Sequence, residues 1–343
     1  MKAVAFDRYG SAEELQYREL SKPHAKSNEL LVRVRASSVN PVDWKIRQGH
    51  LQLLTGFNFP RIVGSDISGV VVEVGREVTN FLPGDEVYTS LNPITGGACA
   101  EYAVVPESSA AIKPKNITHA EAAGVPIAGL TALQALRDLG EIQAGNKVLI
   151  NGASGGVGTF AVQFAKAMNA EVTGVCSAKN REFVKSLGAD FVLDYAEIDF
   201  TQQPKKYDII LDAVATRTFA ECENVLQPEG VYISTLPSVE NLAPMLTSWF
   251  VSGKKAKLIV ANVNTSDLGV LRELIESGKV EPIVDRTYSL AEVAAAHTYS
   301  ETGRAVGKIA IAIDSWRKKK EEGRGKKEEA SSQLPITNSP CNG

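Results

Sequence analysis

Hydrophobic and polar positions follow different patterns in the N-terminal third of the chain and in the rest. Up to about residue 115, short apolar runs are separated by Gly, Pro and Asn turns, which is typical of β-strands. The predicted strands are Lys2–Phe6, Glu29–Val39, Asp66–Val74, Asp85–Thr89 and Ala100–Val105. Together they predict a small, partly open antiparallel barrel.

The part of the chain after residue 115 alternates strands with amphipathic helices. A helical pattern over Thr118–Gly140 leads into a strand that begins at Lys147. Further strands are predicted at Glu171–Cys176, Asp190–Asp194, Tyr207–Asp212, Gly230–Leu236 and Lys257–Val263. Helices are predicted at Thr159–Met168, Asn180–Leu187, Asn241–Ser252 and Ser266–Ser277. This alternation predicts a doubly wound α/β sheet.

The last ordered elements are predicted to return to the first domain. They are the segment Val280–Tyr288, a helix over Leu290–Ser300 and a strand over Lys308–Ile313. The first domain then comprises residues 1–120 and 284–313, and the second comprises residues 121–283. Residues 314–343 are rich in Lys and Glu and poor in apolar residues, which predicts a disordered charged tail.

A glycine-rich turn follows the strand at Lys147. Glycine at 152, 155 and 158 lets backbone N–H groups approach phosphate oxygens, and the helix N-terminus that follows favours an anion. The spacing is G-x-x-G-x-x-G rather than G-x-G-x-x-G, and glycine-rich turns also occur in loops that bind nothing. The strand–turn–helix context favours a nicotinamide cofactor, bound by Gly152, Ser154, Gly155, Gly156, Val157 and Gly158.

The end of the next strand distinguishes the two nicotinamide cofactors. An enzyme that uses NAD usually places an acid there to bind the ribose hydroxyls. This chain instead offers Ser177, Lys179 and Arg181, which suit a 2′-phosphate and therefore predict NADPH. The alternative is that both cations are ordinary solvated charges in the first turn of a helix. Basic residues there oppose the helix dipole, which favours the binding role.

Composition limits the class of protein. The chain has 37 basic and 40 acidic residues and a net charge of −3, so no overall field attracts nucleic acid or anionic lipid. No apolar run reaches the roughly 18 residues that span a bilayer, and no signal-peptide pattern is present. Cysteines at 99, 176, 222 and 341 form no C-x-x-C pair, which suits free thiols in a reducing compartment. We therefore expect a cytoplasmic protein that does not bind nucleic acid and has no transmembrane segment.

Several motifs in order resemble one known family over residues 1–313. They are Ser38–Arg47 (SVNPVDWKIR), Gly64–Val71, Pro83–Val87, Gly96–Tyr102, Ala128–Leu133, Gly152–Gly158, Ser186–Asp190 and Gly307-Lys308. The chain resembles the zinc-free quinone oxidoreductase branch of the medium-chain dehydrogenase/reductase superfamily. Within it, the chain is similar to chloroplast-envelope quinone oxidoreductase homologues and enone reductases. The resemblance implies a GroES-like antiparallel β-barrel catalytic domain, a Rossmann domain, and reduction of an activated C=C bond by NADPH.

The zinc alcohol dehydrogenases of this superfamily carry ligands that the chain lacks. It has Val39-Asn40 and Gly64-Ser65-Asp66 where those enzymes place a Cys and a Gly-His-Glu. The region of their structural zinc loop contains Cys99 alone, and the four histidines are scattered. We therefore expect no metal site. Without a Lewis acid, hydride delivery to an electron-poor alkene or a quinone is favoured over alcohol oxidation.

Reduction of an enone requires a hydrogen-bond donor facing the carbonyl oxygen, where enolate charge develops. Asn40 and Lys45 are the candidate donors, and the resemblance places their segment beside the nicotinamide. Asp43 is a candidate to orient Lys45 or to hold a proton-relay water. Helix initiation offers another explanation, since Asn40 suits an N-cap, Pro41 the first helical position and Asp43 the first turn.

The resemblance also implies further contacts and an assembly. Tyr195 matches a position beside the adenosine phosphate, and Thr131, Asn262 and Lys308 match positions near the nicotinamide end or its phosphates. Family members pair edge to edge through the strand that corresponds to Leu258–Val263, so we expect a homodimer.

Three functions remain in view from the sequence. The first is an NADPH-dependent reductase of α,β-unsaturated carbonyls, such as an enone or enal. The second is an NADPH:quinone reductase that uses the same hydride site. The third, from a different class, is a non-catalytic NADPH-binding redox sensor or interaction protein.

Overall fold

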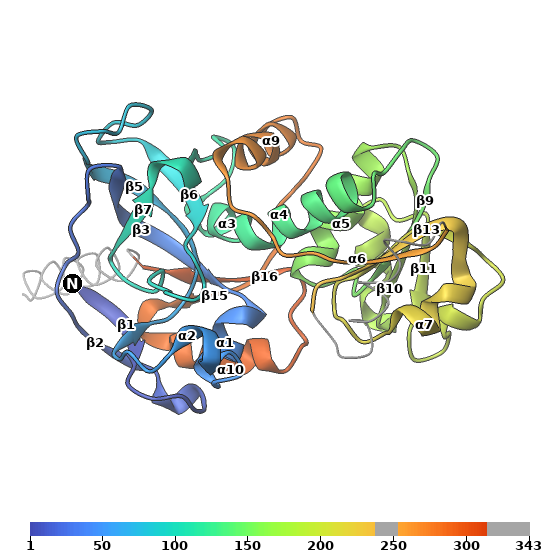
Figure 1. Cartoon of the computed structure of the whole chain (residues 1–343), viewed down its shortest axis with the longest axis horizontal. Helices are drawn as coiled ribbons and strands as arrows, with labels where there is room; N and C mark the ends of the chain where they lie inside the picture. The colour runs from blue at the N-terminus through green and yellow to red at the C-terminus, as the bar shows by residue number, and fades with distance from the viewer. Residues whose placement is uncertain (237–252, 314–343) are drawn as a thin grey trace, which may run out of the picture.

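The chain folds into two domains that lie side by side along the long axis of the molecule (Figure 1). The computed structural model describes residues 1–236 and 253–313. The first domain combines the N-terminal third of the chain with its last described elements. The second contains a parallel sheet and its helices.

A seven-stranded sheet builds most of the first domain, and β3 (Glu29–Val39) lies at its centre. The strand order is β15-β16-β3-β5-β6-β8, and β7 also pairs with β3. The other strands are β5 (Asp66–Val74), β6 (Glu86–Ser90), β7 (Tyr102–Pro106), β8 (Ala111–Ile112), β15 (Val284–Ser289) and β16 (Lys308–Ala312). Alternate residues Leu30, Val32 and Val34 of β3 join one buried cluster, as expected for a curved sheet with a packed interior. The predicted strands are thus confirmed to within one or two residues at each end.

The C-terminal elements return to the first domain, as the sequence predicts. Strand β16 pairs antiparallel with β3, and Ile309 lies opposite Val39. Helix α10 (Val293–Glu301) packs against β1 (Lys2–Phe6) in a third cluster that includes Val4, Phe6 and Val293. Strand β1 also forms a small sheet with β2 (Gln16–Glu19) and β4 (Arg61–Ile62).

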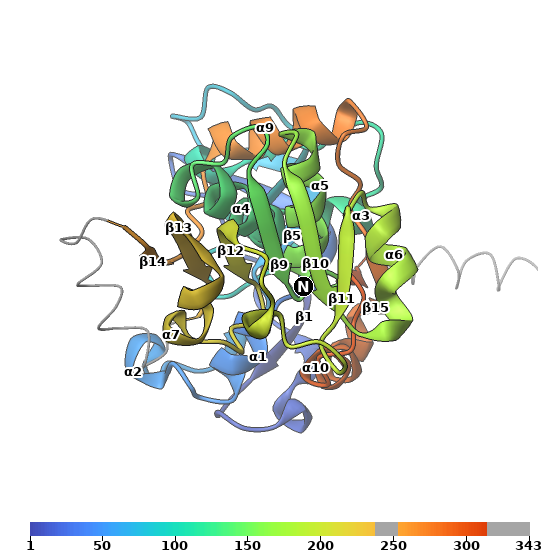
Figure 2. The ribbon, with the colours of Figure 1, turned by 90° about the vertical axis from the view of Figure 1, so that its right-hand side faces the viewer.

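The second domain contains a six-stranded parallel sheet in the order β11-β10-β9-β12-β13-β14. Figure 2 looks onto these strands, with β9 and β12 in the middle. They are β9 (Lys147–Asn151), β10 (Glu171–Cys176), β11 (Phe191–Asp194), β12 (Tyr207–Asp212), β13 (Leu226–Ser234) and β14 (Lys255–Leu258). This is the strand order of a Rossmann sheet, which binds ligands where the order reverses, between β9 and β12.

Both faces of the parallel sheet are buried, which explains the continuous apolar runs of its strands. Val148 and Ile150 belong to the cluster of the helical face, whereas Leu149 belongs to the cluster of the opposite face. The helical face is covered by α4 (Pro126–Gln134), α5 (Gly156–Ala167) and α9 (Thr265–Glu276). Short helices α6 (Arg181–Ser186) and α7 (Phe219–Cys222) follow β10 and β12.

Two predictions about these elements need correction. The helical pattern over Thr118–Gly140 is divided into α3 (His119–Ala123), α4 and a π-helical turn over Ala135–Leu139, because Pro126 starts a new helix at its first position. The strand predicted at Lys257–Val263 is wrong beyond residue 258. There the Gln134 side chain replaces the sheet partner, accepting a hydrogen bond from the backbone N–H of Asn262 and donating one to its carbonyl.

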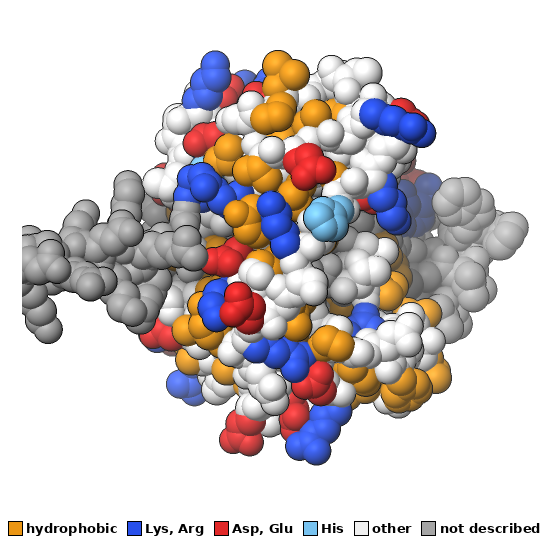
Figure 3. Space-filling view, turned by 90° about the vertical axis from the view of Figure 1, so that its left-hand side faces the viewer, with side chains coloured by type: hydrophobic (Ala, Val, Ile, Leu, Met, Phe, Trp, Pro, Cys, Tyr) orange, Lys and Arg blue, Asp and Glu red, His pale blue; other side chains and the backbone are white. Residues whose placement is uncertain are grey.

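Two further predictions fall outside the described residues: the helix at Asn241–Ser252 and the charged tail at 314–343. Within residues 1–236 and 253–313, no helix is long and apolar enough to cross a bilayer. Figure 3 shows basic and acidic side chains interspersed over one face of the molecule.

Candidate active site

The glycine turn between β9 and α5 has the geometry that close approach to a phosphate requires. Gly152 has φ +82°, a conformation that residues with a Cβ rarely adopt. A Cβ on Gly158 would lie 2.1 Å from the Gly152 carbonyl oxygen, so no larger residue fits there. Helix α5 begins at Gly156, and its first N–H groups have no partner within the helix. Backbone donors and the helix dipole therefore meet at the predicted pyrophosphate site.

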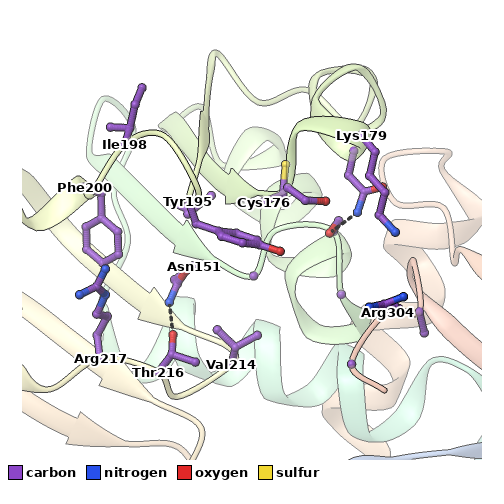
Figure 4. A pocket seen from close by; sticks show the side chains of 18 residues that line it. Asn151, Cys176, Lys179, Tyr195, Ile198, Phe200, Val214, Thr216, Arg217 and Arg304 are labelled. Atoms are coloured by element: carbon purple, nitrogen blue, oxygen red, sulfur yellow. Dashed lines mark hydrogen bonds between the residues drawn. The ribbon is translucent and has the colours of Figure 1, made fainter. Parts of the chain in front are cut away.

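A cavity of about 730 Å³ opens beside this turn (Figure 4). Six of the predicted cofactor residues line it, namely Gly152, Ser154, Gly155, Ser177, Lys179 and Tyr195. Tyr195 lies in the middle of the view, with Lys179 and Arg304 to one side and Phe200 and Arg217 to the other. Other predicted residues, Gly156, Val157, Gly158 and Arg181, lie outside the lining.

The cavity is positively charged at the end of β10. Ser177 and Lys179 follow this strand directly, and Arg304 reaches the same side from the segment between α10 and β16. The described lining residues include Lys and Arg but no carboxylate. Arg181 instead forms an ion pair with Glu197, with 3.5 Å between Nη2 and Oε2. Of the two predicted cations, Lys179 thus lines the cavity and Arg181 does not. Arg304 joins the lining without a recognisable sequence signal, because it belongs to the first domain.

A buried carboxylate behind the lining holds several lining residues in place. Asp212 accepts hydrogen bonds from the Asn151 side chain (2.9 Å) and from the backbone N–H groups of Ala215 and Arg217, and burial raises its pKa. The Asn151 amide also donates to the Thr216 hydroxyl at 3.1 Å. These contacts fix the loop after β12, which contributes Val214 and Thr216 to the lining. Sequence reasoning missed this group, although its position at the end of a central parallel strand is a usable signal.

The predicted catalytic segment lies in α1 (Pro41–Arg47), which starts as the capping interpretation predicts. The Asn40 amide is buried, where Nδ2 donates to Asp66 at 2.9 Å and Oδ1 accepts from the Lys308 ammonium. Asp66 also accepts from the Ser38 hydroxyl at 3.0 Å and lies 3.8 Å from Lys308 Nζ. Burial lowers the pKa of Lys308, whereas Asp66 and Asp43 oppose this shift. The network ties Asn40 into the protein, leaving one of its amide N–H groups for another acceptor.

The hydrogen-bond partners of Asp43 differ from the predicted one, Lys45. Its carboxylate accepts hydrogen bonds from the Asn40 backbone N–H at 2.8 Å and from the Ser65 hydroxyl at 2.5 Å. Lys45 instead places its Nζ 5.5 Å from the Trp44 ring centroid. Burial lowers the pKa of Lys45, which favours proton release from this ammonium. Asp43 thus holds the start of α1, and Lys45 does not belong to the buried network of Asn40, Asp66 and Lys308.

The titration of Asp43 yields a stability prediction. Its pKa is raised from 3.8 to about 7, mainly by burial and also by the negative charge of Asp66. The hydrogen bonds from Ser65 and Asn40 and the positive charge of Lys308 lower the pKa and offset part of this rise. Between pH 4 and 7 the folded state therefore binds more protons at Asp43 than the unfolded state does. Protonated Asp43 thus contributes stability that is fully present below about pH 4 and is lost as the pH rises through 7. We expect Asp43→Asn to remove a slope of up to about 1.4 kcal/mol per pH unit from the unfolding free energy between pH 4 and 7.

Urea unfolding at several pH values measures this slope. The control is Glu73→Gln, which neutralises an exposed carboxylate in β5 and should keep the wild-type slope. Equal slopes for wild type and Asp43→Asn would contradict the prediction.

The remaining predicted residues lie apart from the cavity lining. Thr131 is buried in α4, and the backbone of Asn262 is held by Gln134. Lys308 joins the network below α1 rather than lining the cavity, and its side chain passes close to Gly156. Within the described ranges, no group of three or more His, Cys, Asp or Glu side chains is arranged to hold a metal ion.

Comparisons with known proteins agree with this architecture. Residues 26–115 match the family model described as an alcohol dehydrogenase GroES-like domain, and residues 187–311 match that of a zinc-binding dehydrogenase. The chloroplast envelope quinone oxidoreductase homolog of Arabidopsis thaliana is 38% identical over 322 residues, which cover 91% of this chain and 98% of that protein. The chain belongs to the medium-chain dehydrogenase/reductase superfamily. Its quinone oxidoreductase-like character and its two-domain fold, GroES-like and Rossmann, confirm the sequence predictions.

Two further relatives describe the activity of the group. The 2-methylene-furan-3-one reductase of Solanum lycopersicum is 34% identical over 322 residues, which cover 91% of this chain and 79% of that protein. The structure of Escherichia coli quinone oxidoreductase complexed with NADPH superposes with a TM-score of 0.80 at 26% identity, covering 91% of this chain and all of that one (100%). These relatives show that the present chain is an NAD(P)H oxidoreductase of the quinone oxidoreductase type.

Proposed function

We propose that the protein uses NADPH to reduce the activated C=C bond of α,β-unsaturated carbonyl compounds, without zinc. The observation that carries the cofactor assignment is the cavity at the end of β10. Its lining places Ser177, Lys179 and Arg304 together and contains no carboxylate among the described residues. A 2′-phosphate gains charge-assisted hydrogen bonds there, whereas an acid in this position would repel it.

The residues around the cavity fit a dinucleotide. The first N–H groups of α5 suit the pyrophosphate, and Tyr195 and Arg217 offer flat surfaces for the adenine ring. Thr131, Asn262 and Lys308 stay assigned to the nicotinamide end by resemblance. When bound, NADPH supplies the hydride that adds to the β-carbon of the substrate.

The chain itself must stabilise the oxygen on which enolate charge develops. Lys45 is the proposed donor, since it lies on α1 and is free of the buried network. Asn40 holds the start of α1 through Asp66 and Lys308, and its remaining N–H is a second proposed donor. Asp43 fixes the same turn through Ser65. A protonated Lys45 donates to the oxygen, and its lowered pKa makes proton transfer easier.

The donor chemistry at this position supports a zinc-independent reaction. By the resemblance, Val39-Asn40 and Gly64-Ser65-Asp66 stand where a zinc enzyme of the superfamily has a Cys and a Gly-His-Glu. The Lys308 ammonium lies 3.8 Å from Asp66 and compensates the charge of this carboxylate. The protein itself thus supplies positive charge at this position. A site that works without a Lewis acid suits reduction of an electron-poor bond better than oxidation of an alcohol.

Quinone reduction is the second candidate, and the name of the Arabidopsis relative favours it. Both reactions are tested by following NADPH oxidation with an enone, an enal and a naphthoquinone, and the reverse reaction with an alcohol and NADP⁺. We expect turnover of the enone and enal to exceed that of the quinone, with NADPH preferred over NADH. Zinc is measured in the same preparation by elemental analysis. Turnover of the alcohol alone, or stoichiometric zinc, would contradict the proposal.

The proposal also covers the assembly of the protein, the limits of its two domains and its location in the cell. Strand β14 is an edge of the parallel sheet, and Val260 just beyond it is 78% exposed, which supports a homodimer through this edge. The division at residues 120 and 283 is kept for the two domains. A cytoplasmic location stays a prediction, since the Arabidopsis relative is named for the chloroplast envelope.

A further inference from the structure

The segment of residues 301–308 connects α10 to β16 and contacts the cofactor cavity and both ends of α1. Its first residue, Glu301, pairs with Arg47 at the last position of α1. Its last residue, Lys308, donates to the side chain of Asn40, the residue before α1. Between these ends, Gly303, Arg304 and Ala305 line the cavity.

The contact at the end of α1 involves a fully buried charge. Arg47 is 0% exposed, and its Nη1 donates to the Gly10 carbonyl at 2.9 Å while Nη2 donates to Glu301. The other carboxylate oxygen of Glu301 accepts from the Gln48 side chain at 3.1 Å. Separation of this ion pair would leave the guanidinium buried and uncompensated, which is strongly unfavourable.

A neighbouring histidine adds no second positive charge beside Arg47. His297 lies on α10 and is fully buried, with neither ring nitrogen hydrogen-bonded to a described residue. Burial and the nearby Arg47 lower its pKa to about 3, so it is neutral at physiological pH. Glu301 supplies the carboxylate that pairs with Arg47, which ties the start of the 301–308 segment to the C-terminal end of α1.

The other end of the segment is attached to the glycine turn. The backbone N–H of Gly307 donates to the Ser154 carbonyl at 2.9 Å, and Gly307 pairs with Gly155 in an isolated bridge. The Lys308 ammonium also donates to the Val39 carbonyl at 3.3 Å. Eight residues thus join the glycine turn, the cationic side of the cavity and both ends of the helix that carries Lys45.

From these contacts we infer that Arg47 and Glu301 are positioning residues that couple occupancy of the cavity to the placement of α1. A nucleotide phosphate that binds Arg304 restrains the middle of the segment, and the Glu301–Arg47 pair passes this restraint to α1. Filling of the cavity then fixes the position of the helix that carries Lys45, the proposed substrate donor. The inference rests on the proposed function, because it takes the cavity as the NADPH site and Lys45 as the substrate donor.

Trp44 lies on α1 beside Lys45 and reports on this helix. Its buried Nε1 has no partner among the described residues, so its emission is sensitive to small movements. The other tryptophans are Trp249 and Trp316. Replacing both by Phe gives a single-tryptophan protein. The ligand is adenosine 2′,5′-bisphosphate, which carries phosphate groups but no nicotinamide and therefore cannot reach α1 directly.

We expect the bisphosphate to bind, as measured by calorimetry, and to shift the Trp44 emission. In Glu301→Gln the ligand should still bind while the emission shift is lost, and kcat for the enone should fall with the NADPH KM near that of the parent. Arg47→Lys is the second variant; it keeps the charge but loses the forked geometry, and should reduce the shift in the same way. Glu292→Gln is the matched control, a carboxylate at the other end of α10 that should leave the shift unchanged.

The outcomes separate the inference from the proposed function. Binding without an emission shift in the parent protein, or an undiminished shift in both Glu301→Gln and Arg47→Lys, would overturn the coupling alone. Failure of the bisphosphate to bind would instead overturn the cofactor assignment on which the coupling rests.

Discussion

Replacing Lys179 and Arg304 together by alanine is expected to weaken NADPH binding by roughly 100-fold or more, since hydrogen bonds to charged groups contribute about 1.5–3 kcal/mol each. Both cations line the same side of the cavity, where the 2′-phosphate is proposed to bind. Binding of NADH, which lacks this phosphate, should change little. The dissociation constants of both cofactors can be measured by fluorescence titration.

Arg181→Ala is the matched control for the loss of a cation. Arg181 starts α6, close in sequence to Lys179, but it pairs with Glu197 outside the cavity lining. Its removal should leave the preference for NADPH near the wild-type value. Equal losses of NADPH and NADH binding in the double variant would show that the two cations do not read the 2′-phosphate.

The second large effect is expected from Lys45→Met, which keeps an unbranched side chain one atom shorter and removes the donor. We expect kcat for the enone to fall roughly 100- to 1,000-fold, as for loss of one donor to a developing oxyanion. The dissociation constant of NADPH should stay near that of wild type, because Lys45 does not line the cavity. Steady-state kinetics combined with cofactor titration separates these two effects.

Lys279→Met serves as the control, since Lys279 is an exposed lysine in the loop after α9. It should leave kcat unchanged. A Lys45→Met enzyme with wild-type kcat would assign the oxyanion contact elsewhere, with the second N–H of Asn40 as the next candidate. Because that amide is part of the buried network, its replacement would also disturb α1.

The order of elements was predictable because local rules set it. The glycine turn can be recognised in the sequence because it lies between the apolar run Lys147–Asn151 and an amphipathic helix. The parallel strands read as apolar runs because both of their faces are buried. The end of β14 was not predictable in this way, since the apolar sequence continues to Val263 while the Gln134 side chain takes over the backbone of Asn262.

Charged residues of the site were harder to assign. Two cations follow β10 in the sequence, and nothing in their spacing shows that Lys179 faces the cavity while Arg181 turns to Glu197. Asp43 was predicted to orient Lys45, but the closeness of Ser65 gives its carboxylate a different partner. A hydrogen bond depends on distances of a few ångströms, which sequence spacing does not determine between separate elements.

The two-domain architecture, the glycine turn and the cationic end of β10 could all be predicted from local sequence patterns, because hydrophobic period, turn chemistry and local charge act over a few neighbouring residues. Two features depend instead on how distant elements pack: Arg304 lines the cavity beside the glycine turn, and Asn40, Asp66 and Lys308 form one buried network. These residues are far apart along the chain, and the return of β16 to β3 brings them together. Such contacts arise from the packing of whole elements, so no local pattern records them.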